Sequence, residues 1–196
     1  MALCLRLLTA APRTRAQLEQ ALRRHGVPPQ AAEDVLGRLA RARLIDDPTF
    51  ARMWVESRHH ARGLARRALS AELRQRGVSE NDVREAVAEL SPEQEEDAAR
   101  RLVAGRLAST RGRPLASRMR RLMGLLARKG YPSGLAYRVV REALEQEKAA
   151  GFDEGAGLDE EAILDAELTL DDEAALGDET GLDRGDGFGS GGVVEV

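Results

Sequence analysis

Hydrophobic residues along this chain recur at helical spacing, and the whole pattern repeats about every fifty residues. Segments 18–27, 69–78 and 122–131 align on a glycine near their end, at Gly26, Gly77 and Gly130. Leucines stand eight and four residues before each glycine, which places both on one face of a helix. A glycine just after such a stripe is typical of a helix that ends in a left-handed cap. The pattern therefore predicts three equivalent helices.

A second helix is predicted after each glycine. Apolar residues recur six, nine, ten and thirteen positions further on, again a helical stripe: Ala32, Val35, Leu36, Leu39; Val83, Ala86, Val87, Leu90; Ala136, Val139, Val140, Ala143. The start signals agree, because prolines at 28 and 29 suit a first turn and Ser79 with Asp82 resembles a capping box. Two units also predict a third helix, since residues 50–58 align with 98–106 at an offset of 48.

We therefore expect an all-α fold in which tandem three-helix repeats form an elongated, curved array. The expected divisions are a lead-in helix at 1–13, repeats at 14–61 and 62–110, a repeat at 111–150 that lacks its third helix, and a tail at 151–196. Aromatic residues make up 3% of the chain, which suits a helical core of Leu, Val and Ala. The tail is acidic and rich in glycine, a composition that predicts disorder.

Charge divides the chain sharply. Residues 1–150 carry a formal charge of +11 and residues 151–196 carry −14, which suggests a polyanionic partner for the body. Cys4 is the single cysteine, so no intramolecular disulfide can form, and a reducing cytoplasm is expected. The apolar N-terminal run is interrupted by Arg6, and no uninterrupted apolar stretch is long enough to predict a membrane span.

Two basic clusters are the candidate binding residues. The first comprises Arg58, Arg62, Arg66, Arg67, Arg74 and Arg76, and the second comprises Arg111, Arg113, Arg118, Arg120, Arg121, Arg128 and Lys129. Guanidinium groups pair with phosphates or acidic surfaces and give salt-dependent affinity. The alternative is a solvated helix face balanced by nearby acids. No acid lies between Asp97 and Glu142, so the charge of the second cluster is expected to be uncompensated.

Other chemistry receives little support from the sequence. Asp46 and Asp47 precede Pro48, which favours a helix N-cap over a metal ligand. His59 and His60 are adjacent and diverge on a helix, which argues against a zinc site. Trp54 and Cys4 are interpreted as core residues. No phosphate-binding loop or nucleophile motif is present, so we expect a protein that is not an enzyme and needs no cofactor or metal.

The segments LIDDPTFARMWVESR (44–58), RGLARRALSAELRQRGVS (62–79) and LLARKGYP (125–132) resemble the RecX family over about residues 2–147. RecX proteins regulate the bacterial recombinase RecA. The resemblance implies tandem three-helix repeats and binding along the groove of the RecA–DNA filament, which usually limits recombinase and ATPase activity. It thus implies a monomeric cytoplasmic partner of RecA, and of single-stranded or duplex DNA through the filament, in DNA repair, recombination and the SOS response.

The chain departs from the family pattern in two places. The family often has an aromatic residue, glycine and proline after the first glycine of the second unit, where this chain has Leu64, Ala65 and Arg66. A basic residue that many members carry on the next helix is Ala68 here. These departures change the contacts expected of that helix. The acidic tail lies outside the family pattern.

Two questions stay open at this point. A direct DNA-binding protein with helix-turn-helix-like units is the alternative function, although the second helices begin PQAAED, SENDVR and SGLAYR, which are poor starts for reading bases. The tail either competes with partners for the basic body or only keeps the protein soluble.

Overall fold

In the computed structural model, which describes residues 1–151, the chain forms nine α-helices and one 3-10 turn, with no strand in that range. The helices are α1 (Ala2–Ala10), α2 (Arg15–Arg24), α3 (Pro29–Arg41), α4 (Asp47–Arg62), α5 (Arg66–Gln75), α6 (Glu80–Ala88), α7 (Pro92–Leu107), α8 (Leu115–Arg128) and α9 (Ser133–Ala149), and the turn η1 (Ala108–Thr110) follows α7. The predicted all-α class is confirmed. The predicted disordered tail lies outside the described residues.

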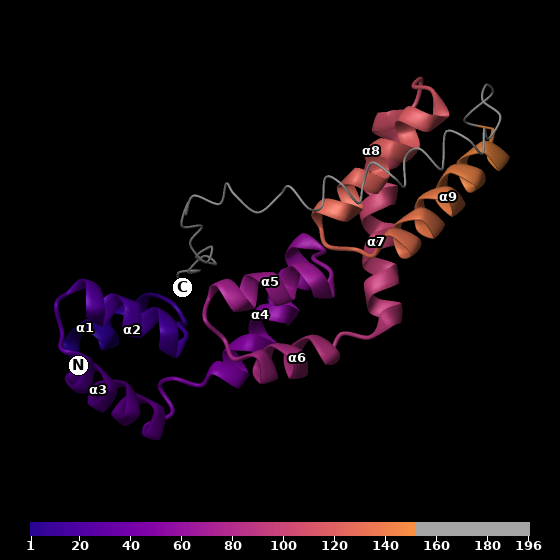
Figure 1. The fold of residues 1–196 in the computed structure, drawn as a ribbon. Coiled ribbons are helices and arrows are strands. Elements are labelled where there is room, and N and C mark those ends of the chain that lie inside the picture. The colour runs from indigo at the N-terminus through magenta and orange to yellow at the C-terminus, as the bar shows by residue number, and fades with distance from the viewer. Residues whose placement is uncertain (152–196) are drawn as a thin grey trace, which may run out of the picture.

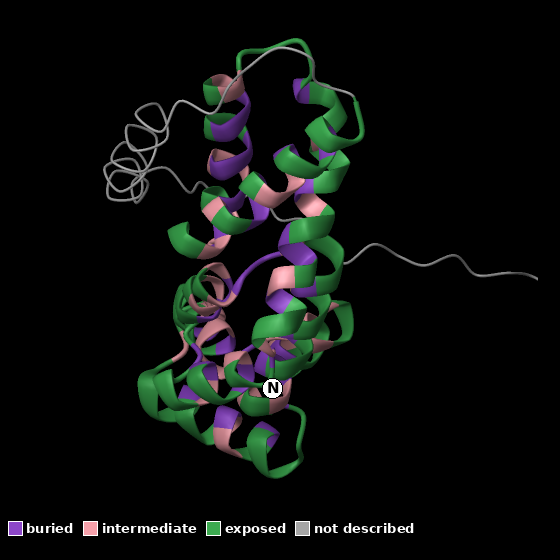
Figure 2. Cartoon of the chain, turned by 90° about the vertical axis from the view of Figure 1, so that its right-hand side faces the viewer, coloured by how far each residue is buried: buried purple, intermediate pink, exposed green. Residues whose placement is uncertain are grey.

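Three separate hydrophobic cores divide the helices into three groups. Helices α1–α3 enclose Leu18, Leu22 and Leu36, α4–α6 enclose Trp54, Leu69 and Leu73, and α7–α9 enclose Met119, Leu122 and Leu126. We call these groups unit 1, unit 2 and unit 3. The units follow one another in the elongated, bent array that the repeat predicts (Figure 1). Buried residues line the inward faces of the helices, while the outward faces are exposed (Figure 2).

The cores group the helices one position earlier than the sequence divisions at 14–61, 62–110 and 111–150. Phe50 and Trp54 of α4 are buried with Leu69 and Leu73 of α5, so α4 opens unit 2 rather than closing unit 1. In the same way α1 is the first helix of unit 1, because Cys4 is buried with Leu18. Unit 3 therefore has its full set of three helices, and the segment at 1–13 is more than a lead-in.

Side-chain caps fix the starts of four helices, and two of these caps, at Ser79 and Asp46, were predicted from the sequence. Thr14 and Gln17 form a capping box, in which each side chain bonds the backbone N–H of the other residue. Ser91 and Gln94 form the same arrangement at the start of α7. The Ser79 side chain accepts from the Asp82 N–H, and Asp46 accepts from the Thr49 N–H at 2.9 Å. The N-cap interpretation of the Asp46–Asp47 pair is confirmed at Asp46.

Unit 1 joins unit 2 through the start of α2. The Thr14 hydroxyl donates to the Arg76 carbonyl at 2.6 Å, and the Arg15 N–H donates to the Asp47 carboxylate at 2.9 Å. Gly77 has a φ of +75°, and a Cβ there would overlap the Ala16 Cβ. The left-handed cap of α5 is thus pressed against α2, and only glycine fits it.

Unit 2 joins unit 3 through equivalent positions. The Ala65 N–H donates to the Lys129 carbonyl at 2.9 Å, and the Arg66 N–H donates to the Glu95 carboxylate at 2.9 Å. A Cβ on Gly130, which has a φ of +85°, would lie 2.6 Å from the Ala68 backbone nitrogen. Each junction therefore has three parts, all contributed by the next unit to the start of the preceding unit's second helix. A backbone carbonyl accepts a hydrogen bond there, a carboxylate caps a backbone N–H, and a glycine touches an alanine.

The phenol of Tyr131 adds a further bond to the second junction. Its hydroxyl donates to the Gly63 carbonyl at 3.0 Å. Burial of the ring, with a smaller contribution from the charge of Glu95, raises the pKa of Tyr131 to about 12, so this donor keeps its proton at neutral pH. The hydroxyl therefore serves as a fixed link between the two units.

Replacement of the three cap glycines by alanine is expected to lower the free energy of unfolding by different amounts. Gly26 has a φ of +70°, but no atom of the described residues lies within 4 Å of the position that a Cβ would take. Gly26→Ala is expected to lower the free energy of unfolding by about 1–2 kcal/mol, from the left-handed backbone alone. Gly77→Ala and Gly130→Ala are expected to lose about 1–3 kcal/mol more through overpacking. Urea unfolding followed by circular dichroism measures this order, and equal losses at all three positions would contradict the junction geometry.

Candidate functional site

Several arginines of the first cluster hold unit 2 together. The guanidinium groups of Arg58 and Arg76 lie over the Trp54 ring, at 4.2 and 3.7 Å from its centroid. The Trp54 indole N–H donates to the Glu72 carboxylate at 2.7 Å, and Arg58 lies 3.8 Å from the same carboxylate. Trp54 is 6% exposed, which confirms its interpretation as a core residue. This arrangement of cations around an aromatic ring stabilises the fold and engages both guanidinium groups within the protein.

Arg66 and Arg74 are also engaged within the protein. The Arg66 guanidinium donates to the Leu90 carbonyl at 2.9 Å and lies 3.8 Å from Glu95, so it ties α5 to the connection between units 2 and 3. Arg74 makes two bonds to Glu80, at 2.7 and 2.9 Å, on an exposed surface. The Arg62 carbonyl accepts from the Lys129 ammonium at 2.9 Å, which brings one residue of each cluster together.

The structure corrects one prediction for the second cluster. Arg118 is 1% exposed and ion-paired with Glu147, which also accepts from Arg111 at 2.6 Å. The Arg118 Nε donates to the Thr110 hydroxyl at 3.1 Å. Arg118 is therefore a core residue rather than a surface contact, and the charge of this cluster is partly compensated. The sequence missed the pair because Glu147 lies 29 residues away, on α9.

The carboxylate of Glu147 remains ionised in this buried site. Burial favours its protonated form, but the bonds and charges of Arg111 and Arg118 outweigh that effect and hold the pKa of Glu147 below its ordinary value of 4.5. Arg118 and Glu147 form a buried bridge between the start of α8 and the end of α9, and the more exposed Arg111 pairs with Glu147 at its edge.

A smaller set of cations remains on the surface. The exposed arginines of the two clusters for which no hydrogen bond or ion pair to another described residue is found are Arg67, Arg113, Arg120, Arg121 and Arg128. Helix α8 buries its apolar residues and contains no acid, so three of these arginines form a uniformly basic outer face. We call Arg120, Arg121 and Arg128 the α8 basic face. Arg67 stands at the position of unit 2 that corresponds to Arg120 in unit 3.

Helix α7 carries two further cations that the sequence analysis did not select. Arg101 and Arg106 of α7 are exposed and have no ion pair among the described residues. Arg106 aligns with Arg58 at the offset of 48, so the repeat itself held the signal. Arg106 cannot form the contacts that Arg58 makes, because the positions of Trp54 and Glu72 are occupied in unit 3 by Leu102 and Leu125.

The net positive charge is largest on unit 3 and smallest on unit 2. Residues 92–151 carry a formal charge of +6, compared with +1 for 47–91 and +4 for 1–46. Such a surface attracts polyanions, and the attraction weakens as salt rises. No group of His, Cys, Asp or Glu side chains within residues 1–151 is arranged to hold a metal ion. No helix in that range has both the length and the apolar character that a membrane span requires.

Comparison with known proteins places these units in one family. Models of the first, second and third three-helix domains of RecX match residues 1–39, 46–87 and 93–140. The regulatory protein RecX of Thermobifida fusca is 64% identical over 146 residues, which are 74% of this chain and 79% of that protein. The Streptomyces coelicolor protein of the same name is 58% identical over 74% of this chain and 78% of its own length.

Solved structures show the same fold. A crystal structure of a regulatory protein RecX has a TM-score of 0.64 at 24% identity, covering 72% of this chain and 69% of that one. A RecX structure from Lactobacillus salivarius has a TM-score of 0.65 at 17% identity, covering 70% and 90%. The helix groups that the three domain models match are the ones that the separate cores define.

The Arg118–Glu147 pair predicts a contrast between two arginines of one helix. Arg118→Ala leaves the Glu147 carboxylate buried with one partner fewer and is expected to lower the free energy of unfolding by about 3–5 kcal/mol. Arg120→Ala, two residues away on the exposed face, is expected to change it by less than about 0.5 kcal/mol. Chemical unfolding of both variants measures the difference, and a small effect of Arg118→Ala would contradict the buried bridge.

The same pair predicts an acid-sensitive contribution to stability. Because the folded-state pKa of Glu147 is depressed, its stabilisation is fully present above the unfolded value near 4.5 and is lost as pH falls through the folded pKa. Wild type is therefore expected to lose more stability than Glu147→Gln between pH 6 and pH 3. Thermal unfolding across that range provides the measurement, and parallel pH profiles would count against the assignment.

Proposed function

The chain belongs to the RecX family, and on this premise we propose that it binds the RecA–DNA filament and limits recombinase, ATPase and strand-exchange activity. The observation that carries the proposal is the acid-free outer face of α8, on the most basic unit of a rigid elongated array. Phosphates within a protein–DNA filament, or acidic side chains along it, are partners that exposed guanidinium groups recognise.

The repeated junctions support binding along an extended partner. Each junction fixes the next unit through backbone bonds and a close glycine–alanine contact, so the units present their surfaces in a set order. A preorganised array loses little conformational freedom when it binds a regular filament. We further propose that the protein acts as a monomeric cytoplasmic regulator, without catalytic chemistry of its own, in DNA repair, recombination and the SOS response.

Direct reading of DNA by the units is the weaker candidate. The third helix of each unit would be the recognition helix, yet α3 exposes Glu33 and Asp34 near its start, and α6 exposes Glu80 and Glu85. Carboxylates at these positions repel the phosphates on either side of a groove. The outer faces of α7 and α8, by contrast, carry exposed arginines that have no ion pair among the described residues, such as Arg101, Arg120 and Arg121. This distribution favours contact with a composite protein–DNA surface.

The proposed regulation predicts a lower rate of ATP hydrolysis by RecA on single-stranded DNA. The decrease is expected at substoichiometric or modest ratios of this protein to RecA, because an elongated array that contacts more than one protomer would act on several at once. Steady-state ATPase assays over a wide titration measure the effect. No change in rate or in filament lifetime would reject the proposed inhibition.

Filament binding and direct DNA binding make different predictions for affinity. If the filament is the partner, binding to labelled single-stranded DNA is expected to strengthen by at least tenfold when RecA and ATP are added, roughly 1.4 kcal/mol of extra binding free energy. Fluorescence anisotropy at constant salt provides the measurement. Equal affinity with and without the recombinase would favour the direct DNA-binding alternative.

The α8 basic face is expected to contribute more binding than the exposed arginines of unit 1. Arg120→Glu and Arg121→Glu together, two reversals as in the control, should weaken filament binding and lower the slope of affinity against salt by roughly 0.7 for each phosphate that is no longer neutralised. The control reverses Arg23 and Arg24 on α2, where Arg23 is already paired with Glu19 at 3.2 Å. Titrations at several salt concentrations compare the two sets, and equal losses would show that total charge, rather than this face, determines binding.

A further inference from the structure

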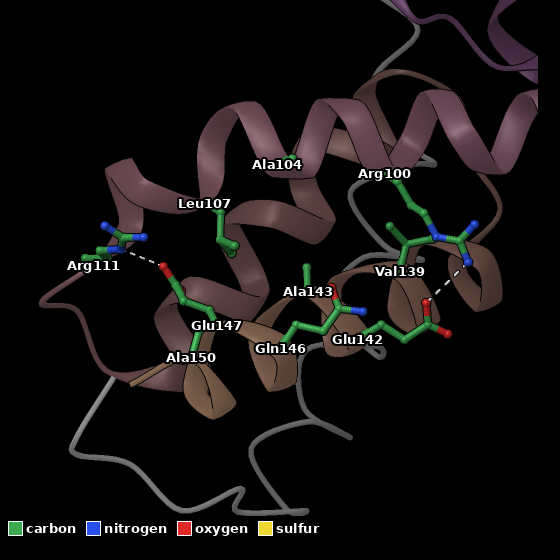
Figure 3. A pocket seen from close by; sticks show the side chains of 10 residues that line it. All are labelled: Arg100, Ala104, Leu107, Arg111, Val139, Glu142, Ala143, Gln146, Glu147 and Ala150. Carbon is green, nitrogen blue, oxygen red and sulfur yellow. Dashed lines mark hydrogen bonds and ion pairs between the residues drawn. The ribbon is translucent and has the colours of Figure 1, made fainter. Parts of the chain in front are cut away.

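A groove of about 360 Å³ runs between α7 and α9 on unit 3 (Figure 3). Ala104, Leu107, Val139 and Ala143 form its apolar part. One end is bounded by Arg100 and Glu142, whose charged groups are 3.4 Å apart, and the other by Arg111 and Glu147, which are 2.6 Å apart. The groove is therefore an apolar slot with an ion pair at each end.

The repeat explains why this slot is open. Ala143 stands thirteen residues after Gly130, and the same position is Leu39 in unit 1 and Leu90 in unit 2. Those leucines are 1% and 6% exposed and belong to the cores of their units. Ala143 is only partly buried, at the edge of its core. Unit 3 thus lacks the side chain with which the other two units fill this position.

The tail of the chain begins at the rim of the groove. Helix α9 ends at Ala149, and Ala150 lines the groove directly before the 45 residues that follow Gly151. Segment 158–170, LDEEAILDAELTL, carries four leucines and an isoleucine. The stretch from Gly151 to Ile163 spans up to about 40 Å when extended, which exceeds the roughly 16 Å of α9 that borders the groove.

Charge favours the same encounter. Segment 158–170 contains five acidic residues and no basic residue, whereas residues 92–151 carry +6. Attachment through a short linker raises the effective concentration of the segment near the groove to about the millimolar range. Weak attraction is then sufficient for substantial occupancy.

We propose that residues 158–170 dock in the groove between α7 and α9 and place an apolar side chain in the space that Leu39 and Leu90 fill in the other units. The acids of the segment then lie beside the arginines of unit 3. This contact is a property of the isolated chain, so it holds or fails independently of RecA binding. It also gives the acidic tail a defined place on the most basic unit.

Amide hydrogen exchange on the full chain, read by NMR, tests the docking. Ala143→Leu restores the side chain that the repeat carries in units 1 and 2, and is expected to fill the slot without disturbing the core. Protection of amides in 158–170 should fall about tenfold, the loss expected when one aliphatic side chain is displaced from an apolar site. The matched control, Ala127→Leu on the exposed surface of α8, should leave that protection unchanged.

A second variant acts from the other side of the contact. Ile163→Ser with Leu164→Ser keeps every charge of the tail and is expected to abolish the same protection, whether or not Ala143→Leu folds well. In wild type, protection should persist at high salt, because apolar burial is not screened. The proposal is overturned if 158–170 is unprotected in wild type, or if both variants leave its protection intact. Protection that vanishes with salt alone would also overturn it, because the tail would then be held by general charge.

Discussion

The array depends on the contact between a glycine in the left-handed region and an alanine of the preceding unit. At Gly77 and Gly130 a Cβ would lie within 2.7 Å of Ala16 and Ala68, so no other residue permits the approach. The approach brings the carbonyl before each glycine onto the start of the preceding unit's second helix. That helix start has unpaired N–H groups, and a carboxylate from the next unit, Asp47 or Glu95, satisfies one of them. One contact therefore ends a helix, sets the spacing between two units and supplies acceptors for the N–H groups at a helix start.

Arginine serves two purposes in this molecule, and local partners decide which. Arg58 has Trp54 and Glu72 beside it and becomes part of the unit 2 structure. Its counterpart Arg106 has leucines at both of those positions and stays exposed. The planar guanidinium can stack, cap carbonyls or bind anions, so one residue type covers all these roles without a change in charge. A basic sequence cluster consequently overstates the charge that a partner meets, since much of it is already engaged within the fold.

The sequence predicted the helices, their caps and the repeat well, because these depend on neighbours three to eight residues apart. It could not predict which helices share a core, because a repeat has the same period wherever a unit is taken to begin. The hydrophobic pattern of α4 is compatible with membership of unit 1 or of unit 2. The binding residues were harder still. Arg67, Arg120, Arg121 and Arg128 were candidates and are exposed, whereas Arg118 was a candidate and is buried. Its partner Glu147 lies on another helix, and no local spacing reveals such a pair.

The Arg118–Glu147 bridge lies where units 1 and 2 have a junction with the next unit. Arg118 aligns with Thr14 and Ala65, the residues that donate hydrogen bonds to carbonyls of the next unit. Helix α8 begins seven residues before Leu122, whereas α2 and α5 begin three residues before their equivalent leucines, so Arg118 lies within a helix instead of at its start. The longer α9 brings Glu147 to Arg118, and the carboxylate pairs with the guanidinium there, whereas Asp47 and Glu95 cap backbone N–H groups at the junctions. In unit 3 this surface is therefore occupied by an internal ion pair, while Arg120, Arg121 and Arg128 on the other face of α8 stay exposed.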